Sequence, residues 1–287
     1  MADVYKIVTD LILERLEQGE IPWKRPWVGQ HRAPRNLSGH TYRGINFFLL
    51  ECLGFPEPYF LTFNQAKKLG GNVKKGEKSC PVIFWKWLEV EEENEAGEQE
   101  KKRVPFARYY RVFNVLQCEG IEYPKEELPE REHSPIEAAE QIVAGYPNPP
   151  EIEYGKLRAC YIPRLDKVEM PDPERFSSVE GFYSVLMHEL THSAFSDSRL
   201  GSKAAEKAAR HGSFDYGVNE LQAEFGAAYL CAHAGIDNSA TVENSAAYIQ
   251  GWSNAIKADR RLVVMSACAA QRAADHILGI TYDDNDK

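Results

Sequence analysis

Apolar positions recur with a helical period near both ends of this chain and with strand-like density in its middle. From Val4 to Leu16 they fall every three or four residues, which predicts an amphipathic helix that ends near Gly19. A short helix closed by glycine is predicted at 61–71, and the β-branched and aromatic composition of 81–87 predicts a strand. The front third therefore mixes helices with strands.

The pattern breaks twice before the rear half. A run of charged residues at 88–103 separates two apolar segments, so we interpret it as the solvated tip of a hairpin that returns through 108–115. Six prolines then surround one predicted helix near 136–143, which is typical of a boundary between folded units. A second hairpin is predicted at 159–171, with its turn near 164–167.

Helical periods dominate the remainder. Ser177 and Glu180 match a capping box, and the apolar spacing that follows predicts a helix through residue 192. Further helices are predicted at 219–233, 242–257 and 260–278. The whole pattern predicts an α+β protein with three parts: a mixed α/β domain at 1–120, a Pro- and Glu-rich connection with one helix at 121–150, and a mostly helical domain with a small sheet at 151–287.

Composition narrows the classes of protein. Apolar residues make up 43% and charged residues 27%, as in soluble globular proteins. The six cysteines lie far apart without a CxxC pair, which argues against a cysteine zinc cluster or a disulfide scaffold and favours a reducing cytoplasm. No apolar run approaches the roughly 18 residues of a membrane span, so no membrane partner is expected.

The distribution of charge modifies this picture. The net charge of −9 discourages a nucleic-acid partner, but residues 1–88 hold 13 Lys and Arg against 8 Asp and Glu, a net +5. Residues 89–151 carry a net −9 and residues 152–287 a net −5. A basic front and an acidic rear indicate two units with different partners.

One motif offers metal chemistry. In Met187-His188-Glu189-Leu190-Thr191-His192, the two histidines stand four apart and form the HExxH pattern with Glu189. On a helix both imidazoles reach one metal ion, and Glu189 can serve as the general base for a water. A catalytic zinc takes three protein ligands, so a third must follow. Two histidines at chance spacing are the alternative.

A second pattern interleaves aromatic residues with Lys and Arg. Ile21-Pro22-Trp23-Lys24-Arg25-Pro26-Trp27 is followed by a basic turn at 72–78 and by the strand containing Trp85. Flat rings stack on exposed bases and cations neutralise phosphates, as single-stranded nucleic acid requires. The alternative is that the rings are core residues with solvated lysines between them.

Residues 9–88 resemble the N-terminal domain of the ArdC-type antirestriction proteins of conjugative plasmids. The matching blocks are Thr9-Asp10, 19–27, Asn36, 42–46, Thr62, 65–66, 70–71 and 74–78. The resemblance implies a domain that binds single-stranded DNA and that also occurs fused to plasmid primases. The DNA-binding candidates are Trp23, Lys24, Arg25, Trp27, Arg35, Asn36, Tyr42, Arg43, Asn46, Lys74, Lys75, Lys78 and Trp85.

Glu220 and Glu224 stand one turn apart at the start of the next predicted helix. This resembles the gluzincin metallopeptidases, in which Glu-x-x-x-Asp follows HExxH. The resemblance implies that Glu220 is the third metal ligand and that Glu224, in place of Asp, holds an imidazole N–H of a ligand. A solvated acidic first turn is the alternative. Zn²⁺ is expected, and Mn²⁺ or Co²⁺ would also suit these donors.

If the site is catalytic, an oxyanion donor is also needed, and Tyr216 and His211 are candidates in the predicted loop before Glu220. A packed tyrosine and a surface histidine would give the same sequence.

The rear half also resembles the metallopeptidase-like domain of ArdC proteins and of phage or plasmid polyvalent proteins. The blocks are Tyr161-x-Pro-x-x-Asp166, Met170-Pro171, Phe176, the HExxH helix, Arg199-Leu200 and 220–224. Membership implies protection of incoming DNA from host restriction, with single-stranded DNA as partner. Two other hypotheses stay open: a metalloprotease that cleaves a host protein or restriction enzyme, with the front domain for delivery, and a purely structural metal with DNA shielding.

Overall fold

A computed structural model describes residues 4–23, 33–93, 99–125, 134–201, 214–236, 238 and 246–281. Within these ranges, the side chains of 85–93, 99–106, 214 and 246–249 are left undescribed. In the described residues helices alternate with three small sheets, so the predicted α+β class is confirmed. No helix in the described ranges is long and apolar enough to span a membrane.

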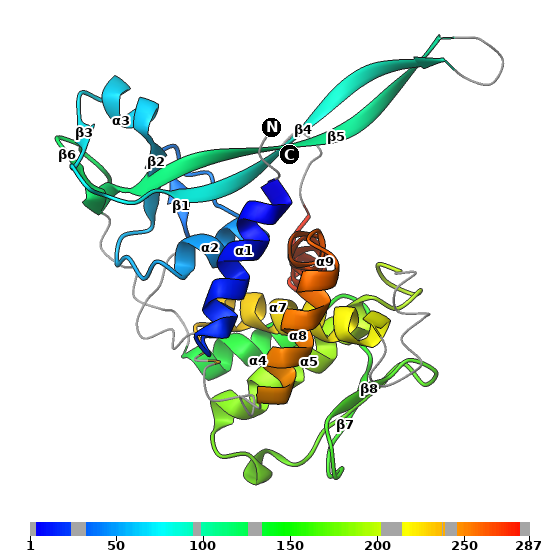
Figure 1. Ribbon diagram of the computed structural model, residues 1–287. Coiled ribbons are helices and arrows are strands. Elements are labelled where there is room, and N and C mark those ends of the chain that lie inside the picture. The colour runs from blue at the N-terminus through cyan, green and yellow to red at the C-terminus, as the bar shows by residue number, and fades with distance from the viewer. Residues whose placement is uncertain are drawn as a thin grey trace.

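The front sheet has the strand order β1-β2-β5-β4. Its strands are β1 (Arg35–Asn36), β2 (Tyr59–Thr62), β4 (Cys80–Glu93) and β5 (Gln99–Asn114). The long β4–β5 ribbon projects away from the helices (Figure 1). Its register sets Glu89 opposite Arg103 and Glu91 opposite Lys101, so the charged run forms paired strands and the predicted hairpin is confirmed. Residues 94–98 lie outside the described ranges.

Short elements complete the front part. They are α1 (Val4–Glu17), α2 (Ile45–Glu51), α3 (Phe63–Lys68), the pair β3 (Asn72–Val73) and β6 (Cys118–Glu119), and the 3-10 turn η1 (Val115–Gln117). The predicted first helix is confirmed, with Val8, Ile12 and Leu16 buried along one side. The short helix predicted at 61–71 is α3, and a capping box between Thr62 and Gln65 starts it.

Four long helices build the described residues of the rear part. They are α5 (Val179–Ala194), α7 (Phe214–Ala234), α8 (Ala246–Ala258) and α9 (Leu262–Ile277). Ser178, not Ser177, caps α5, since its side chain accepts a hydrogen bond from the Gly181 N–H. The helix predicted at 219–233 is α7, which the structure describes from Phe214, five residues before the predicted start.

A three-stranded sheet with the order β7-β9-β8 lies beside α5. Its strands are β7 (Glu151–Glu153), β8 (Cys160–Ile162) and β9 (Lys167–Glu169), followed by the 3-10 turn η2 (Pro173–Arg175). The antiparallel β8–β9 pair confirms the predicted hairpin, and β7 adds a parallel strand that the sequence pattern did not reveal. The predicted helix of the connection is α4 (Pro135–Gly145), which packs on α5 and α7.

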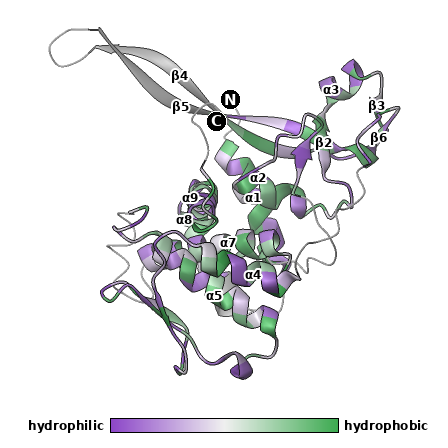
Figure 2. Cartoon of the chain, turned by 180° about the vertical axis from the view of Figure 1, so that it is seen from behind, coloured by the Kyte–Doolittle hydropathy of each residue, from purple (hydrophilic) through white to green (hydrophobic). Residues whose placement is uncertain are grey.

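One hydrophobic core joins the front and rear parts. Trp23 is fully buried, with its ring centroid 4.7 Å from Phe225 of α7 and 5.4 Å from Trp252 of α8. Phe48 of α2 stacks on Phe225 and on Tyr229. Hydrophobic residues are prominent along α1 and α2 (Figure 2), and both helices contribute to this core. The predicted three-part division stays a prediction, but its first and third parts share this packing.

Candidate metal centre

Helix α5 brings two imidazoles together. Leu186, Met187 and Leu190 are buried in the core, which turns His188 and His192 toward α7. The two rings meet edge to face with centroids 4.8 Å apart, and their Nε2 atoms are 3.1 Å apart. Two ring nitrogens at this separation point to a common space between the helices.

Helix α7 supplies carboxylates to the same space. Glu220 Oε2 lies 3.4 Å from His188 Nε2, and Glu220 Oε1 lies 3.7 Å from His192 Nε2. One donor atom from each of the three residues lies within 4.8 Å of the others. Donor atoms around a tetrahedral ion with bonds of about 2.1 Å stand about 3.4 Å apart. The donor set therefore fits a divalent ion in both chemistry and spacing.

Glu224 stands one turn further along α7. Its Oε1 lies 3.5 Å from His188 Nδ1, the nitrogen that faces away from Glu220. A carboxylate at this nitrogen fixes the tautomer of the imidazole and the orientation of its Nε2 lone pair. This is the geometry that the predicted role of Glu224 requires, and its contribution to metal binding stays a prediction.

A glycine allows the two helices to approach. A Cβ atom on Gly226 of α7 would lie 2.2 Å from Cγ2 and 2.5 Å from Oγ1 of Thr191 on α5. Thr191 is fully buried, and its hydroxyl donates to the Met187 carbonyl at 2.7 Å. Because Thr191 lies between the two histidines and Gly226 follows Glu220 and Glu224, this contact sets the distance across the donor space.

The electrostatics of the centre favour a positive charge. Burial lowers the pKa of His188, but Glu220 and Glu224 outweigh burial and raise it well above its ordinary value. Burial raises the pKa of Glu220, yet contacts with His188 and His192 bring it down to about 2. Burial and the neighbouring His188 lower the pKa of His192. The two carboxylates thus favour a positive charge beside His188, the place that a divalent cation would take.

Glu189 lies beside the donor space and is itself held in place. It is buried, and its Oε2 accepts a hydrogen bond of 2.7 Å from the backbone N–H of Tyr161 on β8. The Tyr161 hydroxyl in turn donates to Asp166 Oδ1 at 2.9 Å. Sequence reasoning missed this tether, although Tyr161 and Asp166 belong to one of the matching blocks.

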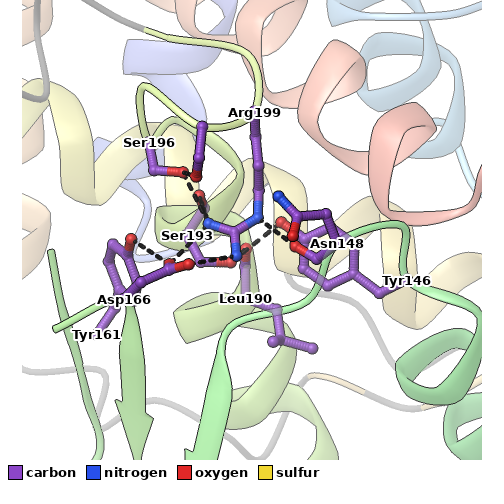
Figure 3. Close-up of polar contacts among 9 residues, drawn as sticks. Tyr146, Asn148, Tyr161, Asp166, Leu190, Ser193, Ser196 and Arg199 are labelled. Atoms are coloured by element: carbon purple, nitrogen blue, oxygen red, sulfur yellow. Dashed lines mark hydrogen bonds and ion pairs between the residues drawn. The ribbon is translucent and has the colours of Figure 1, made fainter.

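Arg199 anchors the hairpin that carries Tyr161 (Figure 3). Its side chain is fully buried and forms a two-pronged ion pair with Asp166, at 2.8 Å and 3.0 Å. It also donates to the carbonyl oxygens of Asn148 and Ser193, at 2.7 Å and 3.1 Å. One guanidinium thus joins the end of α5 to the β8–β9 turn.

The structure describes one of the two predicted oxyanion donors. Tyr216 lies in the first turn of α7 and not in a loop, and its side chain forms a hydrogen bond that contributes to the low pKa of Glu220. It is therefore near the metal centre. His211 lies outside the described residues.

Four of the DNA-binding candidates have contacts inside the fold. Trp23 is a core residue whose ring cannot reach a base, and Tyr42 is buried against Phe60 and Phe84. Asn46 is buried, with both ends of its amide bonded to the Ile83 backbone. Arg43 forms an ion pair with Asp275 of α9, and its role in DNA binding stays a prediction. Each of these side chains joins parts of the fold, which composition alone could not distinguish from a DNA contact.

The other DNA-binding candidates stay predictions. Lys74, Lys75 and Lys78 are exposed, and Arg35 is half-buried. The Asn36 side chain accepts hydrogen bonds from Ser38 and His40 and so closes a local turn. Lys24, Arg25 and Trp27 lie outside the described residues, as does the side chain of Trp85.

Two histidines on one helix, a carboxylate on the next and a tethered glutamate between them form the arrangement of zincin-like metallopeptidases. Residues 137–270 match that family, described as zincin-like metallopeptidase. Residues 2–113 match the N-terminal domain of anti-restriction factor ArdC. The chain belongs to the ArdC family of antirestriction proteins.

Similarity to individual proteins extends over nearly the whole chain. The crystal structure of the antirestriction ArdC protein from plasmid R388, in its metal-free form, has 32% identity and a TM-score of 0.76 and covers 98% of this chain and 100% of its own. The Mn(II)-bound form of the same protein has 33% identity and a TM-score of 0.74 over 97% and 98% of the two chains.

Two further relatives are known from sequence. The uncharacterized protein y4eC of Sinorhizobium fredii is 32% identical over 95% of this chain and 91% of its own length. DNA primase TraC of Escherichia coli is 30% identical over 94% of this chain, which spans only 26% of the primase.

Proposed function

We propose that this protein is an antirestriction factor that binds single-stranded DNA as plasmid or phage DNA enters a cell, and that its rear part carries a metal-dependent peptidase-like site. The observation that carries the proposal is the likeness to the R388 antirestriction protein along the full length of both chains. The ArdC-type front domain, which TraC shares, supports a DNA partner. Its DNA would be met in the cytoplasm, where six free cysteines are stable.

His188, His192 and Glu220 would hold the ion. We assign Zn²⁺ on the donor set, with Mn²⁺ or Co²⁺ as alternatives, and the relative's Mn(II)-bound form supports a divalent ion in this fold. A divalent ion in such a site lowers the pKa of a coordinated water and polarises a carbonyl group.

The chain's own residues would position and move protons. Glu189 takes a proton from the attacking water and passes it to the leaving amine, while the Tyr161 N–H, 2.7 Å from Oε2, fixes the carboxylate. Glu224 keeps His188 in the tautomer that presents Nε2. Tyr216, near Glu220, is our candidate to donate a hydrogen bond to a developing oxyanion, and His211 is the second candidate.

One experiment on DNA entry tests this function. Conjugative transfer of an unmodified plasmid into a restricting recipient is measured with the wild-type protein, His188→Ala and Glu189→Gln, alongside binding of a single-stranded oligonucleotide by each protein. We expect the wild-type protein to raise transfer and to bind the oligonucleotide in a salt-dependent way. Failure of the wild type on either count would refute the proposal.

A second candidate function is a metalloprotease that cleaves a host protein, such as a restriction enzyme, with the front part for delivery. The tethered, buried Glu189 favours it, because a structural metal site needs no base. Glu189→Gln should then keep the metal, by elemental analysis, and lose antirestriction. Full antirestriction in this variant would exclude proteolysis as the operative step, and full antirestriction in His188→Ala would favour a metal with a structural role only.

A further inference from the structure

Two aromatic side chains lie exposed at the base of the β4–β5 ribbon. Phe84 of β4 is 36% exposed and Tyr110 of β5 is 45% exposed. Their rings meet edge to face with centroids 5.3 Å apart. Large aromatic rings are usually covered in a folded protein, and a pair of them on the surface of a sheet often marks a binding site.

Buried aromatic rings support the exposed pair from the core side of the sheet. Tyr42 is buried under Phe84, with ring centroids 6.2 Å apart, and Phe60 of β2 lies 6.4 Å from Tyr42. Phe60 belongs to the main core. The row of rings therefore runs from the core to the surface, so a ligand that stacks on its outer end would meet rings that are already ordered.

A cation shares this face of the sheet. In the β4–β5 register, Arg108 stands directly opposite Phe84, and Tyr110 follows two residues later on the same strand. Directly opposite residues and residues two apart point to the same side of a sheet, so all three side chains share one face. Arg108 is exposed. Residues 80–88 and 104–114, at the base of the ribbon, include Lys86, Arg108 and Arg111 and no Asp or Glu.

We propose that Phe84 and Tyr110 stack on bases of single-stranded DNA and that Arg108 contacts a phosphate of the same strand. The proposal rests on the DNA-binding function proposed above and locates its site. Only a single strand offers unpaired base faces to a flat ring, and a polyanion suits the cation and the local positive charge. The stacking role first predicted for Trp23 thus passes to rings that solvent reaches.

Binding of a fluorescein-labelled 20-nucleotide oligo-dT to the full chain tests the site by fluorescence anisotropy over a range of salt concentrations. We expect Tyr110→Ala to raise Kd about tenfold, and Phe84→Leu to do so by a similar factor, because a stacked base is lost. Tyr110→Phe keeps the ring and should bind like the wild type. Arg108→Ala should reduce the slope of log Kd against log salt by about one.

Two variants serve as matched controls. Tyr154, in the rear part, is 48% exposed, and Phe63, at the start of α3, is 47% exposed with Lys67 over its ring. Tyr154→Ala and Phe63→Ala should leave Kd unchanged, and melting curves show whether each variant is folded. Where Tyr110→Ala does not fold, Phe84→Leu and Arg108→Ala give the result.

The possible failures are distinguishable. Absence of salt-dependent binding by the wild type would refute the proposed function itself. Wild-type binding that survives Tyr110→Ala and Phe84→Leu would overturn the proposed site and leave the function standing. Loss of binding in Phe63→Ala, with Tyr110→Ala unaffected, would likewise overturn it and move the site to α3.

Discussion

Gly226→Ala should separate the helices that carry the proposed metal ligands. The added Cβ would lie 2.2 Å from Thr191 Cγ2 and 2.5 Å from Oγ1, far inside van der Waals contact. Alanine in place of glycine stabilises a helix interior by about 1 kcal/mol. Overpacking a core costs about 1–3 kcal/mol. Because Thr191 is fully buried, we expect the upper end of that cost and a net loss of about 2 kcal/mol.

Thermal melting followed by circular dichroism measures this loss, which corresponds to a decrease in Tm of about 4 °C for a chain of this size. Isothermal titration with Zn²⁺ measures the second effect. Since α7 carries both Glu220 and Glu224, we expect the metal affinity to fall by about 10–100-fold, as when groups that orient metal ligands are lost.

Two further variants make the reasoning refutable. Gly251 lies in α8 with open space around it, so Gly251→Ala should raise stability by about 0.5–1 kcal/mol and leave metal affinity unchanged. Thr191→Ala removes both of the closest atoms and should recover much of the loss in a Gly226→Ala background. Wild-type stability and metal affinity in Gly226→Ala, or additive effects in the double variant, would show that this contact does not set the helix spacing.

Four other predictions concern charged groups. Arg199→Met should cost about 3 kcal/mol, because Asp166 and two backbone carbonyls lose their donor, and an unchanged Tm would contradict this. The hydrogen bond from Arg199 lowers the pKa of Asp166 in the folded protein below its ordinary value of 3.8. The ion pair therefore contributes fully to the free energy of unfolding above pH 3.8, and this contribution is lost as the pH falls through the lowered pKa of the folded state. The difference in urea midpoint between wild type and Asp166→Asn should therefore be constant at neutral pH and shrink below pH 3.8; a difference that persists at lower pH would be inconsistent. Arg43→Ala should lower stability by about 2 kcal/mol and leave the salt dependence of DNA binding unaltered, because the partner of Arg43 is Asp275; a slope reduced by one would identify a phosphate contact. Metal at 100 times its Kd should stabilise the wild type by about 2.7 kcal/mol and have no effect on His188→Ala, as melting with and without a chelator would reveal.

The local parts of the fold and site were predictable from the sequence. Because His188 and His192 are four residues apart, they lie on the same side of any helix that contains them. Helix α1 and the hairpins at 80–114 and 160–169 could be predicted because their patterns depend only on residues close together in the sequence. Predicting Glu220 as a ligand also required the resemblance to gluzincin metallopeptidases, in which a glutamate follows HExxH.

The long-range parts were not predictable. Trp23 packs on Phe225 and Trp252, about 200 residues away, and a tryptophan between prolines and lysines has the same local sequence whether it faces solvent or core. The hydrogen bond that holds Glu189 comes from the backbone N–H of Tyr161. Every residue except proline has such a group, so the residue type does not predict this contact. The need for glycine at position 226 could not be predicted either, because it arises from the close contact with Thr191 on the neighbouring helix.

The shared core limits how the protein can be divided. A fragment that begins at residue 121 would lose Trp23 and Phe48 and leave their partners Phe225, Tyr229 and Trp252 uncovered. Phe225 lies in the same helix as Glu220, so the uncovered side chains would belong to the helix that carries this proposed metal ligand. An isolated rear fragment should therefore aggregate, or bind metal weakly, for reasons unrelated to its chemistry, and the activities of the two parts are best separated by point substitutions in the intact chain.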